Sequence, residues 1–183
     1  MIEAQFWQWI GQSRQNDSAC ERQAQQLQQV LTALPATEIV EFQQIFADKL
    51  ALAYRWDLWG VAYLIGGGCS DDSFEYFCRW LVGQGKARYE QALVDPESVI
   101  DELSEHERDL ECEELFYASG AAYEALTGEM MPMVDLAYPR HPVGESWTEA
   151  ELVGRFPRVA RNYGIGELNT QNEVNPESIP TLE

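Results

Sequence analysis

One stretch of the sequence decides the fold: residues 54–81, which read YRWDLWGVAYLIGGGCSDDSFEYFCRWL. Residues 57–65 are apolar on nearly every side of a helix, which predicts a buried central helix. Three glycines at 66–68 end that helix, because glycine tolerates the positive φ of a helix C-terminus. Ser70 or Asp71 then caps the next helix, whose apolar residues recur at helical spacing. This pair of helices is expected at the centre of the molecule.

Most of the remaining chain shows the same periodicity. Apolar residues recur with a period near 3.6, and no segment shows the sustained period of two that is typical of a strand. We therefore expect an all-α fold, an irregular bundle of about six to eight helices with less than about a tenth of the residues in strands. Prolines become frequent after Met130. The sequence predicts a helical core domain at residues 1–130, followed by a C-terminal extension and flexible tail at residues 131–183.

The charge of the chain restricts its partners. The chain carries 31 Asp and Glu against 12 Lys and Arg, which gives a net charge of −19. Such a field repels phosphate backbones and anionic lipid surfaces, so neither nucleic acid nor a membrane is expected as a partner. It attracts basic proteins and cations. The alternative is that the acidity provides solubility alone.

The cysteines and the N-terminus point to a location. Cys20, Cys69, Cys78 and Cys112 form no CxxC pair, and the two histidines are remote from them in sequence, so neither a zinc finger nor any cofactor is expected. The first residues lack a basic signal region, and no apolar run is long enough to span a bilayer. These features predict a cytoplasmic protein whose thiols are free and mostly buried.

Several motifs in the first 130 residues resemble a widespread bacterial family of proteins with a domain of unknown function. The motifs are Phe6-Trp7, Arg55-Trp56-Asp57-Leu58-Trp59-Gly60, Gly66-Gly67-Gly68-Cys69-Ser70-Asp71-Asp72, the Phe74-to-Leu81 run and Gly85-Lys86-Ala87-Arg88-Tyr89. The resemblance implies a helical, cytoplasmic bacterial protein. It implies no activity.

A candidate ligand site surrounds the three glycines. Its residues are Arg55, Asp57, Trp59, Tyr63, Asp71, Asp72, Glu75 and Arg79. Carboxylates of this kind bind divalent cations or exchange protons, and aromatic rings line small-molecule pockets. The glycine turn itself offers backbone N–H groups to an anion, although two aspartates follow it and no P-loop lysine is present.

Structural explanations compete with each element of this site. The glycines and Ser70 can simply cap two helices, Arg–Asp pairs can fix helix ends, and aromatic residues at helical spacing are more often core. Cys69 lies beside a helix N-terminus, which favours a lowered thiol pKa. No histidine is near Cys69 in the sequence to activate it.

A candidate docking face lies in residues 95–114, which hold ten carboxylates and one basic residue, Arg108. Glu107, Glu111 and Glu114 recur at i, i+4 and i+7, so on a helix they would share one face. The arginines of the extension (Arg140, Arg155, Arg158 and Arg161) can return to this acidic region or bridge to another copy.

Three functions remain open from the sequence. The first is an acidic regulatory protein that binds a basic protein partner, in the manner of an immunity protein or antitoxin. The second is a small-molecule or metal-binding enzyme that uses the candidate ligand site. The third is a structural or oligomeric scaffold. The absence of a recognisable catalytic spacing favours the first over an enzyme.

Overall fold

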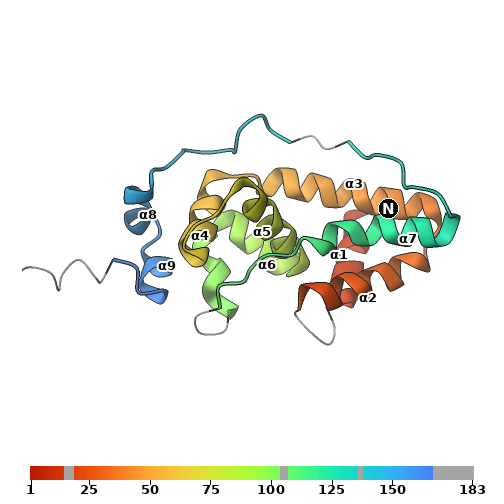
Figure 1. The fold of residues 1–183 in the computed structure, drawn as a ribbon, viewed down its shortest axis with the longest axis horizontal. Coiled ribbons are helices and arrows are strands. Elements are labelled where there is room, and N and C mark those ends of the chain that lie inside the picture. Colours follow the sequence, from red (N-terminus) through yellow and green to blue (C-terminus); the bar gives the residue numbers. More distant parts are fainter. Residues whose placement is uncertain (15–18, 104–106, 136–137, 167–183) are drawn as a thin grey trace, which may run out of the picture.

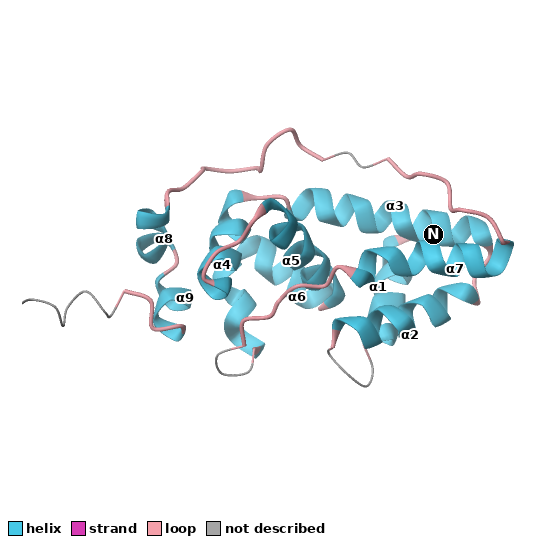
Figure 2. Ribbon diagram, in the orientation of Figure 1, coloured by secondary structure: helices cyan, strands magenta, loops and turns pink. Residues whose placement is uncertain are grey.

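The computed structural model describes residues 1–14, 19–103, 107–135 and 138–166 (Figure 1). The described part is built from helices, and its one β feature is an isolated bridge between Arg55 and Val143, so the all-α prediction is confirmed (Figure 2). None of its helices is long and apolar enough to cross a membrane. The α-helices are α1 (Glu3–Ser13), α2 (Cys20–Thr32), α3 (Ala36–Ala53), α4 (Trp56–Gly66), α5 (Asp71–Gly83), α6 (Lys86–Val94), α7 (Ala118–Thr127), α8 (Glu149–Arg155) and α9 (Pro157–Asn162), with 3₁₀ helices η1 (Pro96–Glu102) and η2 (Glu114–Tyr117).

One end of the molecule is a bundle of α1, α2, α3 and α7 (Figure 1). The apolar faces of these helices meet in an aromatic core, where the ring of Phe6 lies 4.8 Å from that of Phe42 and 6.0 Å from that of Phe46. All three side chains are buried. Burial of large aromatic faces supplies much of the apolar area that stabilises such a bundle.

The helices α4 and α5 are the pair predicted from the opening stretch. Leu58, Val61 and Ile65 of α4 are fully or almost fully buried, as expected for a helix that is apolar on most sides. The helix packs against α5 on one side and against η1, α8 and α9 on others. The glycines at the end of α4 lead directly into the start of α5. Apart from Arg55, which precedes α4, the residues of the candidate ligand site therefore lie on these two helices.

Between α7 and α8, the described residues 129–135 and 138–146 form non-helical chain that runs along the outside of α3 (Figure 1). The side chain of Gln44 holds it by both amide atoms, donating to the Asp135 carbonyl at 2.9 Å and accepting from the Asp135 N–H at 3.0 Å. Further along, Val143 exchanges backbone hydrogen bonds with Tyr54 and Trp56. We call this segment the strap.

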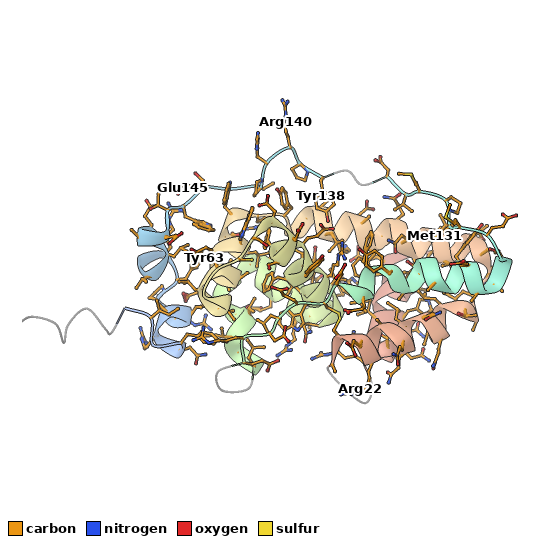
Figure 3. The ribbon with its side chains drawn as sticks, in the orientation of Figure 1. Arg22, Tyr63, Met131, Tyr138, Arg140 and Glu145 are labelled. Carbon is orange, nitrogen blue, oxygen red and sulfur yellow. A yellow bond between two sulfur atoms is a disulfide. The ribbon has the colours of Figure 1, made fainter. Side chains whose placement is uncertain are left out.

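The extension folds back on the acidic body, which is one of the two alternatives that its arginines suggested. The guanidinium of Arg158 donates to Asp95 at 2.8 Å and also pairs with Asp101. Arg155 pairs within the extension itself, and Arg140 points away from the helices (Figure 3). The tail predicted to be flexible lies outside the described residues from 167 onward. The proposed division at residue 130 stays a prediction.

The expectation of four free thiols is wrong for two of them. Cys20 at the start of α2 and Cys112, which lies 92 residues further on, form a disulfide. They meet because the segment before η2 runs along α5, where the Cys112 N–H donates to the Tyr76 carbonyl at 3.1 Å. Cys69 and Cys78 are free. The argument for a reducing compartment from cysteine usage therefore no longer holds.

Candidate functional site

The glycine junction is a structural turn. Gly67 ends α4 in the left-handed conformation, with φ of 71°, and the Gly68 N–H donates to the Tyr63 carbonyl at 2.9 Å. Ser70 then caps α5, since its side chain accepts the Ser73 N–H at 3.2 Å. These bonds are those of a helix C-cap and N-cap, and they use groups that an anion would need. The structure supports the capping interpretation of this turn over the phosphate one.

Arg55 and Asp57 form an ion pair with each other at the start of α4. The guanidinium Nε donates to Asp57 Oδ1 at 2.9 Å, and a second bond joins Nη2 to Oδ2. Asp57 Oδ1 also accepts the Leu58 N–H at 2.8 Å. The pair therefore fixes the helix start, as Arg–Asp pairs commonly do.

Arg79 is held in an aromatic cage. Its side chain is almost completely buried, donates to Glu75 at 2.6 Å and donates to the Glu113 carbonyl at 3.0 Å. Its guanidinium carbon lies within 5.3 Å of three ring centroids. These rings belong to Tyr76, Phe116 and Tyr117. Cation–π contacts of this kind stabilise a desolvated guanidinium, so Arg79 joins α5 to η2.

The aromatic residues of the opening stretch form a continuous stack. Trp59 lies parallel to Trp56 at 5.4 Å and to Phe74 at 4.8 Å, and the stack continues through Phe77 to Trp80. Because both faces of Trp59 are covered, its role is packing, and its indole N–H donates to the Cys69 carbonyl at 3.0 Å. Tyr63 packs its ring on Trp147, which follows the strap. Trp80 is buried and Trp59 is half-buried against the core, so the interpretation of these aromatic residues as core holds fully for Trp80 and in part for Trp59.

Three of the predicted carboxylates do share a cavity. Asp71, Asp72 and Glu75 border a space of about 250 Å³ on one side of α5. The other described residues that line it are Tyr54, Cys78, Tyr138 and Pro139. The strap therefore forms one side of the cavity, where Tyr138 lies between the strap and the helices (Figure 3). The Tyr138 hydroxyl oxygen is buried and has no hydrogen-bond partner among the described residues, and desolvation raises the pKa of this hydroxyl. Arg55 and Asp57 pair away from this cavity.

The thiol pKa of Cys69 is raised, whereas its position beside a helix N-terminus favoured a lowered pKa. Burial raises the pKa of its thiol to about 12, and the negative charges of Glu111 and Asp71 add to the rise. The helix N-terminus does not compensate, because a half-buried thiol beside carboxylates is stabilised in its neutral form. The lowered pKa that a helix N-terminus favours is therefore not found at Cys69.

The acidic segment is extended, so the expectation that Glu107, Glu111 and Glu114 share a helix face is wrong. Residues 107–112 have no helical structure, and η2 begins only at Glu114. Leu110 and Cys112 are buried while their charged neighbours are exposed, which is the alternation of an extended chain. The bond from Cys112 to Tyr76 holds this conformation against α5.

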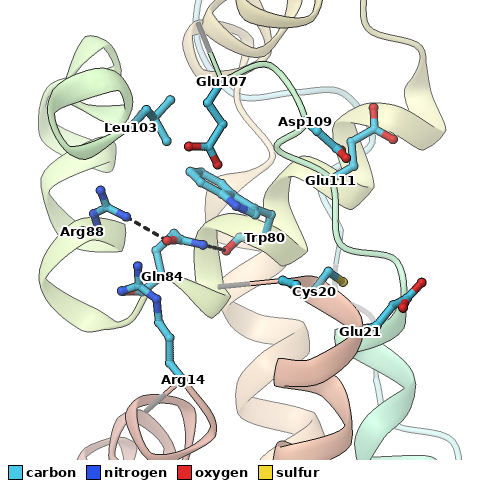
Figure 4. A pocket seen from close by; sticks show the side chains of 11 residues that line it. Arg14, Cys20, Glu21, Trp80, Gln84, Arg88, Leu103, Glu107, Asp109 and Glu111 are labelled. Carbon is cyan, nitrogen blue, oxygen red and sulfur yellow. Dashed lines mark hydrogen bonds between the residues drawn. The ribbon is translucent and has the colours of Figure 1, made fainter. Parts of the chain in front are cut away.

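The alternation places Glu107, Asp109 and Glu111 on one wall of a cavity of about 530 Å³ (Figure 4). The opposite wall carries Arg14 and Arg88. The remaining described lining residues are Ala19, Cys20, Glu21, Trp80, Gln84 and Leu103. The Arg88 guanidinium donates to the Gln84 side chain at 2.8 Å. The cavity is a polar cleft in which, among the described residues, four carboxylates (Glu21, Glu107, Asp109 and Glu111) outnumber two arginines.

A second set of carboxylates lies around Tyr76. Desolvation raises the pKa of the Tyr76 hydroxyl, and the charges of Glu113 and Asp72 raise it further. Tyr117, which is 55% exposed, donates to Glu113 at 3.4 Å. We call this surface the acidic face: Asp71, Asp72, Tyr76, Glu111, Glu113 and Tyr117. The acidic face therefore combines residues of the candidate ligand site with residues of the candidate docking face.

Two tyrosines, Tyr54 and Tyr138, and the disulfide were not predicted from the sequence. Tyr54 directly precedes the opening motif, and Tyr76 lies inside it, so their aromatic character was visible but their neighbours were not. Tyr138 stands in a proline-rich segment with no periodic pattern. Cys20 and Cys112 carry no spacing signal, because their pairing depends on the tertiary path of the chain.

Comparison with known proteins gives one match. No curated protein and no solved structure matches the chain. A family model described as "Protein of unknown function (DUF4240)" matches residues 1–125, which include α1 to α6, the acidic segment and most of α7. The chain therefore belongs to the DUF4240 family, as the resemblance of its opening motifs predicted.

Proposed function

We propose that this protein binds a basic protein partner through the acidic face. One observation carries the proposal: a carboxylate from the start of α5 and one from the extended segment, Asp72 and Glu113, lie beside Tyr76, and Glu113 also accepts a hydrogen bond from Tyr117. Asp71, Asp72, Glu111 and Glu113 are exposed there. Surfaces of this sign steer the approach of basic proteins, and tyrosine is enriched among the residues that dominate binding energy.

The charge of this surface is poorly neutralised by the cations near it. Arg79 is buried and already pairs with Glu75. Arg108 donates to the Ile65 carbonyl at 2.7 Å and stacks on the ring of Tyr163, so its guanidinium is already engaged by these two groups. A regulator of the immunity or antitoxin type, which covers a basic surface of its target, fits this arrangement. The location in a bacterial cytoplasm rests on the resemblance of the motifs.

The test compares two variants with the same change in charge. Face variant D72N/E111Q/E113Q removes three charges from the acidic face. Control variant E90Q/E124Q/E129Q removes one exposed charge each from α6, from α7 and from the start of the strap. Tagged proteins are used to capture partners from the native host. We expect the wild type and the control to retain the same basic protein and the face variant to lose it. Equal capture by both variants would contradict the proposal.

A second candidate function is favoured by the cavity under the strap. Its three carboxylates and the unpartnered Tyr138 hydroxyl suit a small organic cation or a divalent metal ion, the ligand class of the enzyme hypothesis. Thermal unfolding with a panel of amines and divalent cations tests it. A ligand that binds there should raise the Tm of the wild type and have a smaller effect on Tyr138→Phe. If no compound in the panel raises the Tm of the wild type, ligand binding in this cavity is rejected and partner binding is the function that remains.

A further inference from the structure

Two sulfur atoms and one carboxylate meet at the junction of α2, the extended segment and η2. The ligand atoms of Cys20, Cys112 and Glu114 all lie within 4.8 Å of one another. Glu114 Oε2 lies 2.9 Å from Cys20 Sγ. Cys20 begins α2, whereas Cys112 and Glu114 lie together in and just after the extended segment, 92 residues or more further on. The fold therefore assembles this group from two parts of the chain that are distant in the sequence.

The disulfide alone does not explain the position of Glu114. A sulfur atom in a disulfide carries no proton, so it has no hydrogen bond to donate to a carboxylate. Glu114 is exposed and has solvent available to it. A carboxylate oxygen beside two sulfur atoms is, by contrast, the arrangement of ligands around a thiophilic cation.

We propose that the reduced protein binds a zinc ion through the thiolates of Cys20 and Cys112 and the carboxylate of Glu114. Tetrahedral zinc has bonds of about 2.3 Å to sulfur and about 2.0 Å to oxygen, so the two sulfurs need to be about 3.8 Å apart and each about 3.5 Å from the oxygen. The Cα atoms of the two cysteines are 5.2 Å apart. Rotation of the cysteine side chains supplies the required separation while the backbone stays in place.

The surroundings fix two of the ligands. The Cys112 side chain is buried, and its backbone is held by the hydrogen bond to Tyr76. Cys20 is the first residue of α2, where the helix dipole stabilises a thiolate. Cys20 also lines the cleft of about 530 Å³, so a fourth coordination position would face that cleft and be open to water or a small ligand.

Disulfide and zinc are alternatives at this site. A thiol reductant supplies two electrons and two protons, which convert the disulfide to two thiols while two molecules of the reductant become a disulfide. Zinc then displaces both protons from the thiols. The oxidised protein holds α2 to the acidic segment by the S–S bond, and the reduced protein holds them by the metal.

The experiment uses cobalt(II) as a coloured substitute for zinc in the full chain. After reduction by a phosphine, we expect a thiolate-to-cobalt charge-transfer band that saturates at one equivalent and disappears when zinc is added. The oxidised protein, Cys20→Ser and Cys112→Ser should lack the band. Glu114→Gln should weaken binding about tenfold or more, within the range for altered metal sites. Cys69→Ser is the matched control and should keep the band.

A second readout needs no variant. Zinc should slow the reaction of two of the four thiols of the reduced wild type with an aromatic disulfide reagent. No charge-transfer band in the reduced wild type, or a band that Cys69→Ser removes, would overturn the proposal. Thiol reactivity that zinc leaves unchanged would overturn it too.

Discussion

Both oxygens of the Glu97 carboxylate accept the backbone N–H of Arg158, each at 3.0 Å. This contact joins η1 to the first turn of α9, where Pro157 occupies the first helical position. Glu97 is 8% exposed, so the bond is made largely away from water. It explains how a short helix from the extension is fixed on the body of the protein, together with the pairs that Arg158 makes with Asp95 and Asp101.

We predict that Glu97→Ala lowers the free energy of unfolding by about 1–3 kcal/mol, the cost of leaving a buried N–H without its acceptor. Glu97→Gln keeps one oxygen as an acceptor and should cost less. Urea denaturation measures both. A loss below about 0.5 kcal/mol for Glu97→Ala, the range of ordinary surface substitutions, would mean that the extension is not held by this contact.

A second prediction concerns the close packing of α4 against the extension. A Cβ atom at Gly60 would lie 2.5 Å from Phe156 Cε2 and 2.9 Å from Leu152 Cδ2, so Gly60→Ala should destabilise the protein by about 1–3 kcal/mol. Gly11→Ala is the control, because a Cβ there meets nothing within 4 Å. That change should stabilise the protein by about 0.5 kcal/mol, since alanine favours the helix. Equal effects of the two substitutions in thermal unfolding would contradict the packing of Phe156 on α4.

A third prediction concerns the aromatic stack. Trp59→Ala should lower the free energy of unfolding by about 3 kcal/mol, near the lower end of the range for a large aromatic, because the side chain is only half-buried. Trp59→Phe keeps a ring between Trp56 and Phe74 and should cost about 1 kcal/mol or less, like other substitutions that preserve most of the packing. Urea melts that show no loss for Trp59→Ala would place this ring outside the core.

The local features of the fold could be predicted from the sequence because they depend on near neighbours. The glycines that end α4 and the reciprocal capping bonds of Thr148 and Glu151 are examples. The acidic segment was misread, because carboxylates at i, i+4 and i+7 imitate a helix. The buried pair Leu110 and Cys112 shows the period of two that the segment follows.

The candidate site was predicted in part for the same reason. Asp71, Asp72 and Glu75 share one helix, so their meeting at one cavity follows from helix geometry. The approach of Glu113 to Tyr76 and of the strap to α5 depends on the path of the chain over long distances. Neither periodicity nor residue spacing encodes such contacts.

A fourth prediction follows from the raised pKa of Cys69. With a pKa of about 12, the thiol is almost entirely protonated at pH 8, so its alkylation by iodoacetamide should be about a hundredfold or more slower than that of a model thiol of pKa about 8.5. Because the folded state holds this proton more tightly than the unfolded state, the associated stability is present below about pH 8.5. It is lost as pH rises toward 12.

Mass spectrometry of the native protein measures the rate of alkylation at Cys69, and unfolding of the protein before alkylation provides the reference rate. Glu111→Gln should raise the native rate, because it removes a negative charge that opposes the thiolate. A native rate equal to the reference would show that Cys69 is neither desolvated nor influenced by Glu111.

The most direct measurement of the central claim is the association rate of the basic partner, once captured, as a function of salt concentration. If the acidic face steers that partner, the association rate constant of the wild type falls steeply as ionic strength rises. The slope should become shallow in D72N/E111Q/E113Q and stay close to the wild-type value in E90Q/E124Q/E129Q. A slope that is the same in all three proteins, or a wild type that captures no basic protein, would contradict binding through the acidic face.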